Sequence, residues 1–235
     1  MYKTCVYPLG EAAVTIEWGD EISPAINARV HALHAALIAS PLPGQIESVP
    51  AYISLTLYYD PLTLAFDDLK TEIQARLARL ETDAPSSSSG RLHVIPVVYG
   101  GEAGPDLDAV AAETGLTPKQ VMAEHCAETY RVYMVGFSPG FPYLGQTSPR
   151  IAVPRLRTPR TRVPAGSVAL AGRQTGLYPA ATPGGWRLIG KTGWRFFDPN
   201  RRPPARLQPG DQVQFRSAAP GENEGEIEHG PDWGE

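Results

Sequence analysis

The sequence predicts an α+β protein in which a small two-layer α/β N-terminal domain precedes a larger β-rich domain. Before residue 83, two amphipathic helix patterns are interleaved with short strand patterns, and two helices against one small sheet form a layered unit. From residue 130 onward, short apolar runs are separated by glycine and proline turns, which is typical of a β-sandwich or barrel. The high totals of glycine (23) and proline (24) favour the same loop-rich architecture over a helical bundle.

The elements of the first domain follow from the spacing of apolar residues. Alternation of apolar and polar side chains predicts strands over 4–9, 12–18 and 52–59. Apolar residues at three- and four-residue spacing predict helices over 23–40 and 66–80, the first beginning with a Ser-Pro cap. The buried stripe of the first helix is predicted to consist of Ile26, Val30, Leu33 and Leu37.

The domain limits are predicted from composition. The stretch 83–90 contains four consecutive serines and reads as a flexible linker, which gives an N-terminal domain over 1–88 and a second domain over 89–216. The apolar run at 92–98 either closes the first sheet or opens the second domain. The last stretch, 217–235, is acidic and nearly free of apolar residues, so we expect a disordered tail.

The second domain is predicted to begin with two short helices, 106–114 and 117–128, on either side of Gly115. A helix-turn-helix DNA reader shares this outline, but the acidic balance of the chain disfavours that interpretation. We expect β-structure in the remaining apolar runs, which lie at 130–135, 163–171, 174–179, 182–192, 196–198 and 211–215.

Charge and cysteine usage exclude several classes of protein. The formal charge of −4 and a pI of about 5.8 argue against a dedicated nucleic-acid binder. Cys5 and Cys126 lie in no metal-ligand spacing, so we expect neither a metal site nor a disulfide framework, and a cytoplasmic protein. The chain shows no signal peptide, and no apolar run of roughly 18 residues that would span a membrane.

One segment of the second domain, 136–145, combines glycines, prolines and aromatic residues. Its prolines exclude a regular helix, and its glycines permit positive φ or close backbone approach. We interpret it as a rigid loop over a pocket or interface, although a well-packed structural loop would have the same composition. Its candidate binding residues are Phe137, Gly140, Phe141 and Tyr143.

A second segment of the same character supplies further candidate binding groups. Gly184-Gly185-Trp186 offers backbone amides beside a large aromatic face. The segment also carries polar side chains that could contact a ligand, namely Gln174, Tyr178 and Thr192.

Cations are the most specific chemical signal in this half of the chain. Five arginines lie between residues 150 and 162, and guanidinium groups suit carboxylate or phosphate. Most belong to a solvated surface, but Arg150 and Arg160 each follow a proline, which fixes the approach of the chain, so we rank them higher. With Lys191 they are the candidate electrostatic groups, while His125 is either a proton carrier or a structural histidine. No Walker loop, HExxH or nucleophile elbow is present.

These motifs together resemble a known family. The residues that carry the resemblance are the 136–145 segment, the Pro-Arg pairs at 149–150 and 159–160, the run 163–168, and Pro183-Gly-Gly-Trp186 followed by Gly190-Lys-Thr192. They resemble the 5-oxoprolinase B-subunit family, also called PxpB or KipI, allophanate hydrolase subunit 1, or carboxyltransferase subdomains C and D. The family usually has arginine where Lys191 stands, which keeps the charge but not the bidentate geometry.

The resemblance implies a cyclophilin-like β-barrel as the second domain. It also implies a non-autonomous component of an ATP-dependent enzyme that opens 5-oxo-L-proline, a cyclic amide, to L-glutamate. The implied partners are a cyclophilin-like C-subunit (PxpC/KipA-like) and an A-subunit (LamB/YcsF-like), with ATP and Mg as cofactors and ATP shared with or supplied by the partner. The alternatives are an inhibitor of a sporulation histidine kinase and a component of the allophanate or urea amidolyase type.

Overall fold

The computed structural model describes residues 4–82, 90–219 and 221–222. The chain divides into two compact units, Met1–Ser88 and Ser89–Glu235, which are described separately. The predicted linker at 83–89 and most of the predicted tail, from residue 223 onward, lie outside the described residues, while Ser217 is the last residue of a strand. None of the helices in the described part of the chain is long and apolar enough to span a bilayer.

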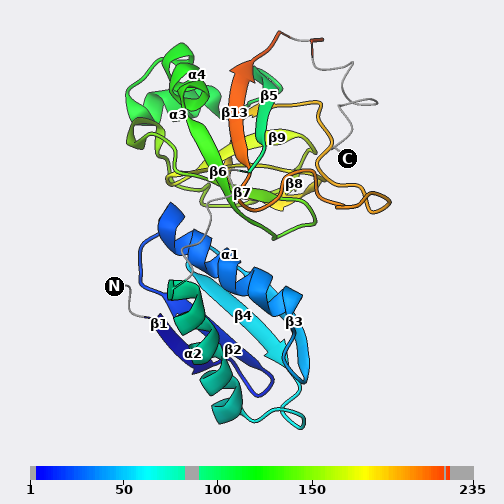
Figure 1. The fold of residues 1–235 in the computed structure, drawn as a ribbon. Helices are drawn as coiled ribbons and strands as arrows, with labels where there is room; N and C mark the ends of the chain where they lie inside the picture. The colour runs from blue at the N-terminus through cyan, green and yellow to red at the C-terminus, as the bar shows by residue number, and fades with distance from the viewer. Residues whose placement is uncertain (1–3, 83–89, 220, 223–235) are drawn as a thin grey trace. The chain divides into compact units, whose positions relative to one another are not determined.

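The first unit is a four-stranded antiparallel sheet with two helices on one of its faces (Figure 1). The strand order is β1-β2-β4-β3. The elements are β1 (Thr4–Pro8), β2 (Ala13–Trp18), α1 (Pro24–Ala39), β3 (Gln45–Pro50), β4 (Ser54–Tyr59) and α2 (Phe66–Thr82).

The helix α1 shows how the sequence determines this unit. The hydroxyl of Ser23 accepts a hydrogen bond from the backbone N–H of Ile26 at 3.2 Å, and Pro24 occupies the first turn. The four residues of the predicted stripe are all buried, and they pack with Leu69 and Ile73 of α2 against β2 and β4. Burying each such side chain stabilises the unit by about 1.5–3 kcal/mol.

Strand β3 was not predicted. It is an edge strand that pairs with β4 through an irregular register, and its residues do not alternate cleanly between buried and exposed. The predicted third strand is correct in the part that forms β4, but it begins at Ser54 rather than at residue 52.

The second unit contains a closed seven-stranded barrel in the order β10-β7-β6-β13-β5-β12-β9, which confirms the predicted β-rich architecture as a barrel (Figure 1). Strands β13 and β5 are parallel, and the other neighbours are antiparallel. The strands are β5 (Leu92–Tyr99), β6 (Thr129–Val135), β7 (Pro142–Gly145), β9 (Ser167–Ala171), β10 (Gln174–Leu177), β12 (Arg187–Lys191) and β13 (Gln212–Ser217).

The run at 92–98 therefore opens the second unit instead of closing the first sheet, because β5 pairs with β12 and β13. Two predictions for this unit were wrong. Residues 142–145 are not part of a loop but form β7, and the expected strand at 196–198 is reduced to a single bridge between Phe197 and Ala205.

Two helices and a small sheet complete the second unit. Helices α3 (Leu107–Thr114) and α4 (Pro118–Ala127) pack on the barrel, and α4 begins with a capping box between Thr117 and Gln120. Outside the barrel, β8 (Arg160–Val163) and β11 (Thr182–Gly184) form a two-stranded sheet.

Candidate functional site

An aromatic pocket of about 270 Å³ opens on the second unit. Among the described residues, its lining contains aromatic rings, prolines, glycine backbone and one cation, and no carboxylate. The lining residues are Phe137, Phe141, Tyr143, Arg155, Pro159, Tyr178, Pro183, Gly184, Gly185 and Trp186. Seven of the predicted binding residues are in this set, so the structure brings the two Gly/Pro/aromatic segments together around one cavity.

The first wall comes from the turn between β6 and β7. The N–H of Gly136 donates to the carbonyl of Phe141 at 2.9 Å, and the N–H of Phe141 donates to the carbonyl of Ser138 at 3.0 Å. This closed turn holds Phe137 at φ +66°, a conformation that a bulky L-residue adopts only under strain. The side chain of Phe137 is nevertheless 63% exposed at the pocket. The strain is therefore not offset by burial of this ring.

Phe141 is the centre of the aromatic cluster. Its ring makes edge-to-face contacts with Tyr143, Tyr178 and Trp186, at centroid distances of 4.9, 5.2 and 5.6 Å. Such pairs contribute about 0.5–1.5 kcal/mol each beyond area burial. The contacts hold rings from β7 and from the 178–186 segment in a fixed arrangement.

Tyr178 places a hydroxyl group at the second wall. The backbone N–H of Trp186 is directed at the phenolic oxygen and lowers its pKa, so the hydrogen of the protonated hydroxyl remains available to donate. Burial raises the pKa of Tyr178, so the phenol stays protonated at neutral pH. A Cβ at Gly184 would lie 2.4 Å from this oxygen, so the approach of Gly184 to the hydroxyl requires glycine.

Arg155 is the one charged residue among the described residues of the lining, and it is not one of the predicted site residues. Its guanidinium carbon lies 5.7 Å from the centroid of the Trp186 ring. It makes no ion pair with any described residue, and its charge opposes the burial-driven rise in the pKa of Tyr143 and Tyr178. The signal that selected Arg150 and Arg160 was present here too, because Arg155 follows Pro154.

The two arginines predicted from the sequence as site residues, Arg150 and Arg160, both form ion pairs. Arg150 pairs with Glu124 of α4. Arg160 donates to Asp106 at 2.7 Å, and the second carboxylate oxygen of Asp106 accepts from the N–H of Leu188 at 2.7 Å. Neither arginine lines the pocket. Both pairs join separate elements of the unit.

His125 lies in the barrel core. Its Nε2 is 2.9 Å from the hydroxyl of Thr175, its Nδ1 is 2.7 Å from the hydroxyl of Tyr99, and its ring stacks on Phe215 at 4.4 Å. Because Thr175 donates to the carbonyl of Ala169, Nε2 carries the proton and Nδ1 accepts from Tyr99. Burial lowers the pKa of His125 to about 3. This arrangement supports the structural alternative for His125.

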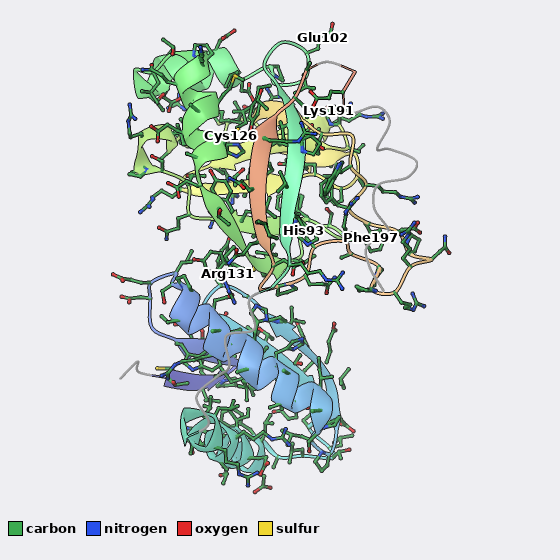
Figure 2. All side chains as sticks on the ribbon, turned by 45° about the horizontal axis from the view of Figure 1, so that its top comes forward. His93, Glu102, Cys126, Arg131, Lys191 and Phe197 are labelled. Carbon is green, nitrogen blue, oxygen red and sulfur yellow. The ribbon has the colours of Figure 1, made fainter. Side chains whose placement is uncertain are left out.

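The other predicted site residues lie outside the pocket lining. Figure 2 shows the exposed Lys191 at the end of the barrel that carries Glu102, away from His93 and Arg131. Thr192 is buried, and its hydroxyl accepts from the N–H of Trp194 at 3.3 Å. The remaining two residues contribute to the fold through the backbone. Gln174 of β10 pairs with Gly145 of β7, and Gly140 packs against Phe197.

The residues of this pocket do not fit Mg-ATP. Among the described residues there is no cluster of three or more His, Cys, Asp or Glu side chains that could hold a metal ion. In the part of the chain that the structure describes, the lining supplies one cation and no carboxylate, and Mg²⁺ with nucleotide phosphates usually takes carboxylate ligands. The pocket has the character of a site for a small organic molecule.

Comparison with known proteins places the chain in a family. The family model "Carboxyltransferase domain, subdomain C and D" matches residues 4–207. The B-subunit of 5-oxoprolinase from Bacillus subtilis (strain 168) is 46% identical over 217 residues, which covers 88% of this chain and 90% of that protein. The chain belongs to the 5-oxoprolinase B-subunit family. A second member, from Escherichia coli O157:H7, is 43% identical and covers 92% of this chain and 96% of its own length.

Solved structures agree with this family membership. TTHA0988 is 40% identical with a TM-score of 0.76; the match covers 88% of this chain and 40% of the longer TTHA0988 chain. PH0987 from Pyrococcus horikoshii is 44% identical with a TM-score of 0.53, covering 91% and 97% of the two chains. The urea amidolyase of K. lactis shares the fold at a TM-score of 0.77 and 18% identity, over 97% of this chain and 16% of that one.

Proposed function

We propose that this chain is a cytoplasmic B-subunit of an ATP-dependent 5-oxoprolinase. The reaction is 5-oxo-L-proline + ATP + two molecules of water to L-glutamate + ADP + phosphate. The observation that carries the proposal is the identity of 43–46% with two 5-oxoprolinase B-subunits, over about nine tenths of each protein.

The pocket supports the proposal through its size and chemistry. Pockets for drug-sized ligands have volumes of roughly 300–1,000 Å³, so a cavity of about 270 Å³ suits a smaller molecule. Its flat aromatic rings suit a small ring, and Arg155 suits an anionic group. A cyclic amide that carries a carboxylate combines these two features.

The chain acts as one part of a complex in this proposal. The described residues of the pocket lining include no carboxylate or histidine that could act as a general base, and they do not fit Mg-ATP. The PxpC/KipA-like and LamB/YcsF-like partners therefore supply the missing groups, including those that bind the nucleotide. TTHA0988 supports this view, since its match to this chain is joined to further polypeptide in one longer chain.

Reconstitution tests the proposal directly. The purified chain is mixed with the PxpC/KipA-like and LamB/YcsF-like proteins of the same organism, and phosphate release is followed with and without 5-oxo-L-proline. We expect ATP hydrolysis that depends on 5-oxo-L-proline and disappears when any one of the three proteins is omitted. The absence of such hydrolysis with all three proteins folded, or full activity without this chain, would overturn the proposal.

A further inference from the structure

Several side chains with polar groups line the pocket, and the charged one of them has no ion-pair partner among the described residues. Arg155, Arg157 and Arg162 make no ion pair with a described residue, and of these three Arg155 lines the pocket. The guanidinium of Arg155 and the phenols of Tyr143 and Tyr178 line this same pocket, and the charge of Arg155 lowers the pKa of both phenols against the effect of burial.

From these observations we propose that Arg155 binds the carboxylate of the cyclic amide and determines substrate specificity at the pocket. In this arrangement the ring of the substrate lies against the aromatic cluster around Phe141, and the hydroxyl of Tyr178 donates a hydrogen bond to the same ligand. The inference rests on the proposed function for the identity of the substrate. It adds which residue recognises which part of that substrate.

The geometry favours Arg155 over the other arginines as the anchor. Arg160 is held by Asp106 and Arg150 by Glu124, so their charges are already compensated within the fold. Arg155 is exposed at the mouth of the pocket and lies over the face of Trp186, which orients its planar group without neutralising it. It is therefore available to form a bidentate pair with an incoming carboxylate.

The same features favour an organic carboxylate over a nucleotide phosphate. A triphosphate needs several cations or a metal, whereas the described residues of this lining offer one guanidinium. Aromatic rings and prolines make up most of the lining. They can exclude water from around a small ring, but they offer a polyanion neither positive charge nor hydrogen-bond donors. We therefore place the cyclic amide here and the nucleotide outside this pocket.

The test measures KM for each substrate in the assembled complex. In Arg155→Gln, KM for 5-oxo-L-proline should rise by at least about tenfold, the effect of one charged hydrogen-bonding group, while KM for ATP stays unchanged. Arg155→Lys should fall between this variant and the wild type, because it keeps the charge but not the planar fork. Arg157→Gln, an exposed neighbour outside the lining, is the matched control and should leave both constants within about twofold. An unchanged KM for 5-oxo-L-proline in Arg155→Gln, or a rise in KM for ATP instead, would overturn the assignment.

A binding experiment on the full chain alone separates this inference from the proposed function. The Trp186 indole resonance is followed by NMR during titration with 5-oxo-L-proline and with pyrrolidin-2-one, which has the same ring and no carboxylate. We expect the wild type to prefer the carboxylate compound, and Arg155→Gln to lose that preference. If this holds while the reconstituted complex shows no activity, the proposed function fails and the carboxylate site stands. If the complex is active but Arg155→Gln changes neither KM for 5-oxo-L-proline nor the binding preference, the proposed function stands and the carboxylate site fails.

Discussion

Two aromatic regions of the barrel unit differ in how their polar groups are satisfied. In the core, the side chains of Tyr99, His125 and Thr175 form one chain of hydrogen bonds that ends on the carbonyl of Ala169. In the pocket, Arg155 has no ionic partner among the described residues, and the hydroxyl of Tyr178 keeps a hydrogen to donate. Polar groups whose partners lie within the fold stabilise it, whereas polar groups without such partners can still bind a ligand.

Removal of the imidazole of His125, the centre of the core network, should have the largest effect on stability. His125→Ala would leave a cavity beneath Phe215 and deprive Tyr99 and Thr175 of their shared partner. We expect the free energy of unfolding to fall by about 3–4 kcal/mol, measured by urea denaturation of the full chain.

Lys191→Ala serves as the control for this variant, because Lys191 is exposed and makes no ion pair with a described residue; it should change stability by less than about 0.5 kcal/mol. A His125→Ala protein that is as stable as the wild type but inactive would show that His125 acts in the reaction. That result would contradict its assignment as a structural residue of the core.

The same network predicts a pH dependence of stability. The pKa of His125 is about 3 in the folded protein, against an ordinary value of 6.5. Below pH 6.5 the His125 imidazole binds a proton in the unfolded chain but stays neutral in the folded protein. The stability that this neutral histidine contributes is therefore fully present above this pH and is lost as the pH falls. Between pH 7 and pH 5 the loss should be about 2 kcal/mol.

Burial also lowers the pKa of His34, so the measurement compares the wild type with His125→Gln. The difference in stability between the two proteins should shrink by about 2 kcal/mol from pH 7 to pH 5. Parallel pH profiles for the two proteins would mean that His125 is accessible to protons in the folded state.

The contrast between the regions also explains what the sequence could and could not predict. Periodicity predicted both helices of the first unit, because burial of an apolar face depends on local spacing. Short apolar runs between glycine and proline turns predicted the β-rich second unit. Neither pattern could show that His125 is enclosed, since this depends on Thr175 and Tyr99 arriving from distant strands. Arg155 was within reach of sequence reasoning through Pro154, but its lack of an acidic partner emerges only from the fold.

A smaller effect is expected from reshaping the pocket wall. Gly184→Ala places a methyl group 2.4 Å from the hydroxyl oxygen of Tyr178, so the phenol has to move. We expect a loss of stability of about 1–2 kcal/mol and a higher KM for 5-oxo-L-proline in the assembled complex.

The neighbouring glycine provides the matched control for this change. At Gly185 a Cβ would have its nearest contact at 3.7 Å, an ordinary van der Waals distance to Pro159. Gly185→Ala should therefore leave stability within about 0.5 kcal/mol of the wild type. Equal effects of the two substitutions on KM would show that the position of the Tyr178 hydroxyl is unimportant for binding.

Substitution of Phe137 should have the smallest effect on stability. It should also separate the core from the pocket most clearly, because stability and activity should respond differently. Its backbone is held at φ +66° while its ring remains 63% exposed, so the fold bears strain at this residue and gains little burial from it. Asparagine adopts this conformation at lower cost. Phe137→Asn should therefore leave stability unchanged or raise it by up to about 1 kcal/mol, although the edge contact with Phe141 is lost.

Activity should change in the opposite direction, because the pocket loses an apolar wall at its mouth. Turnover of 5-oxo-L-proline by the complex should fall in Phe137→Asn and be largely kept in Phe137→Leu, which retains both the apolar surface and the strain. A loss of stability above about 1 kcal/mol in Phe137→Asn would instead place Phe137 with the core. Unchanged stability together with lower turnover would assign the Phe137 ring to ligand binding.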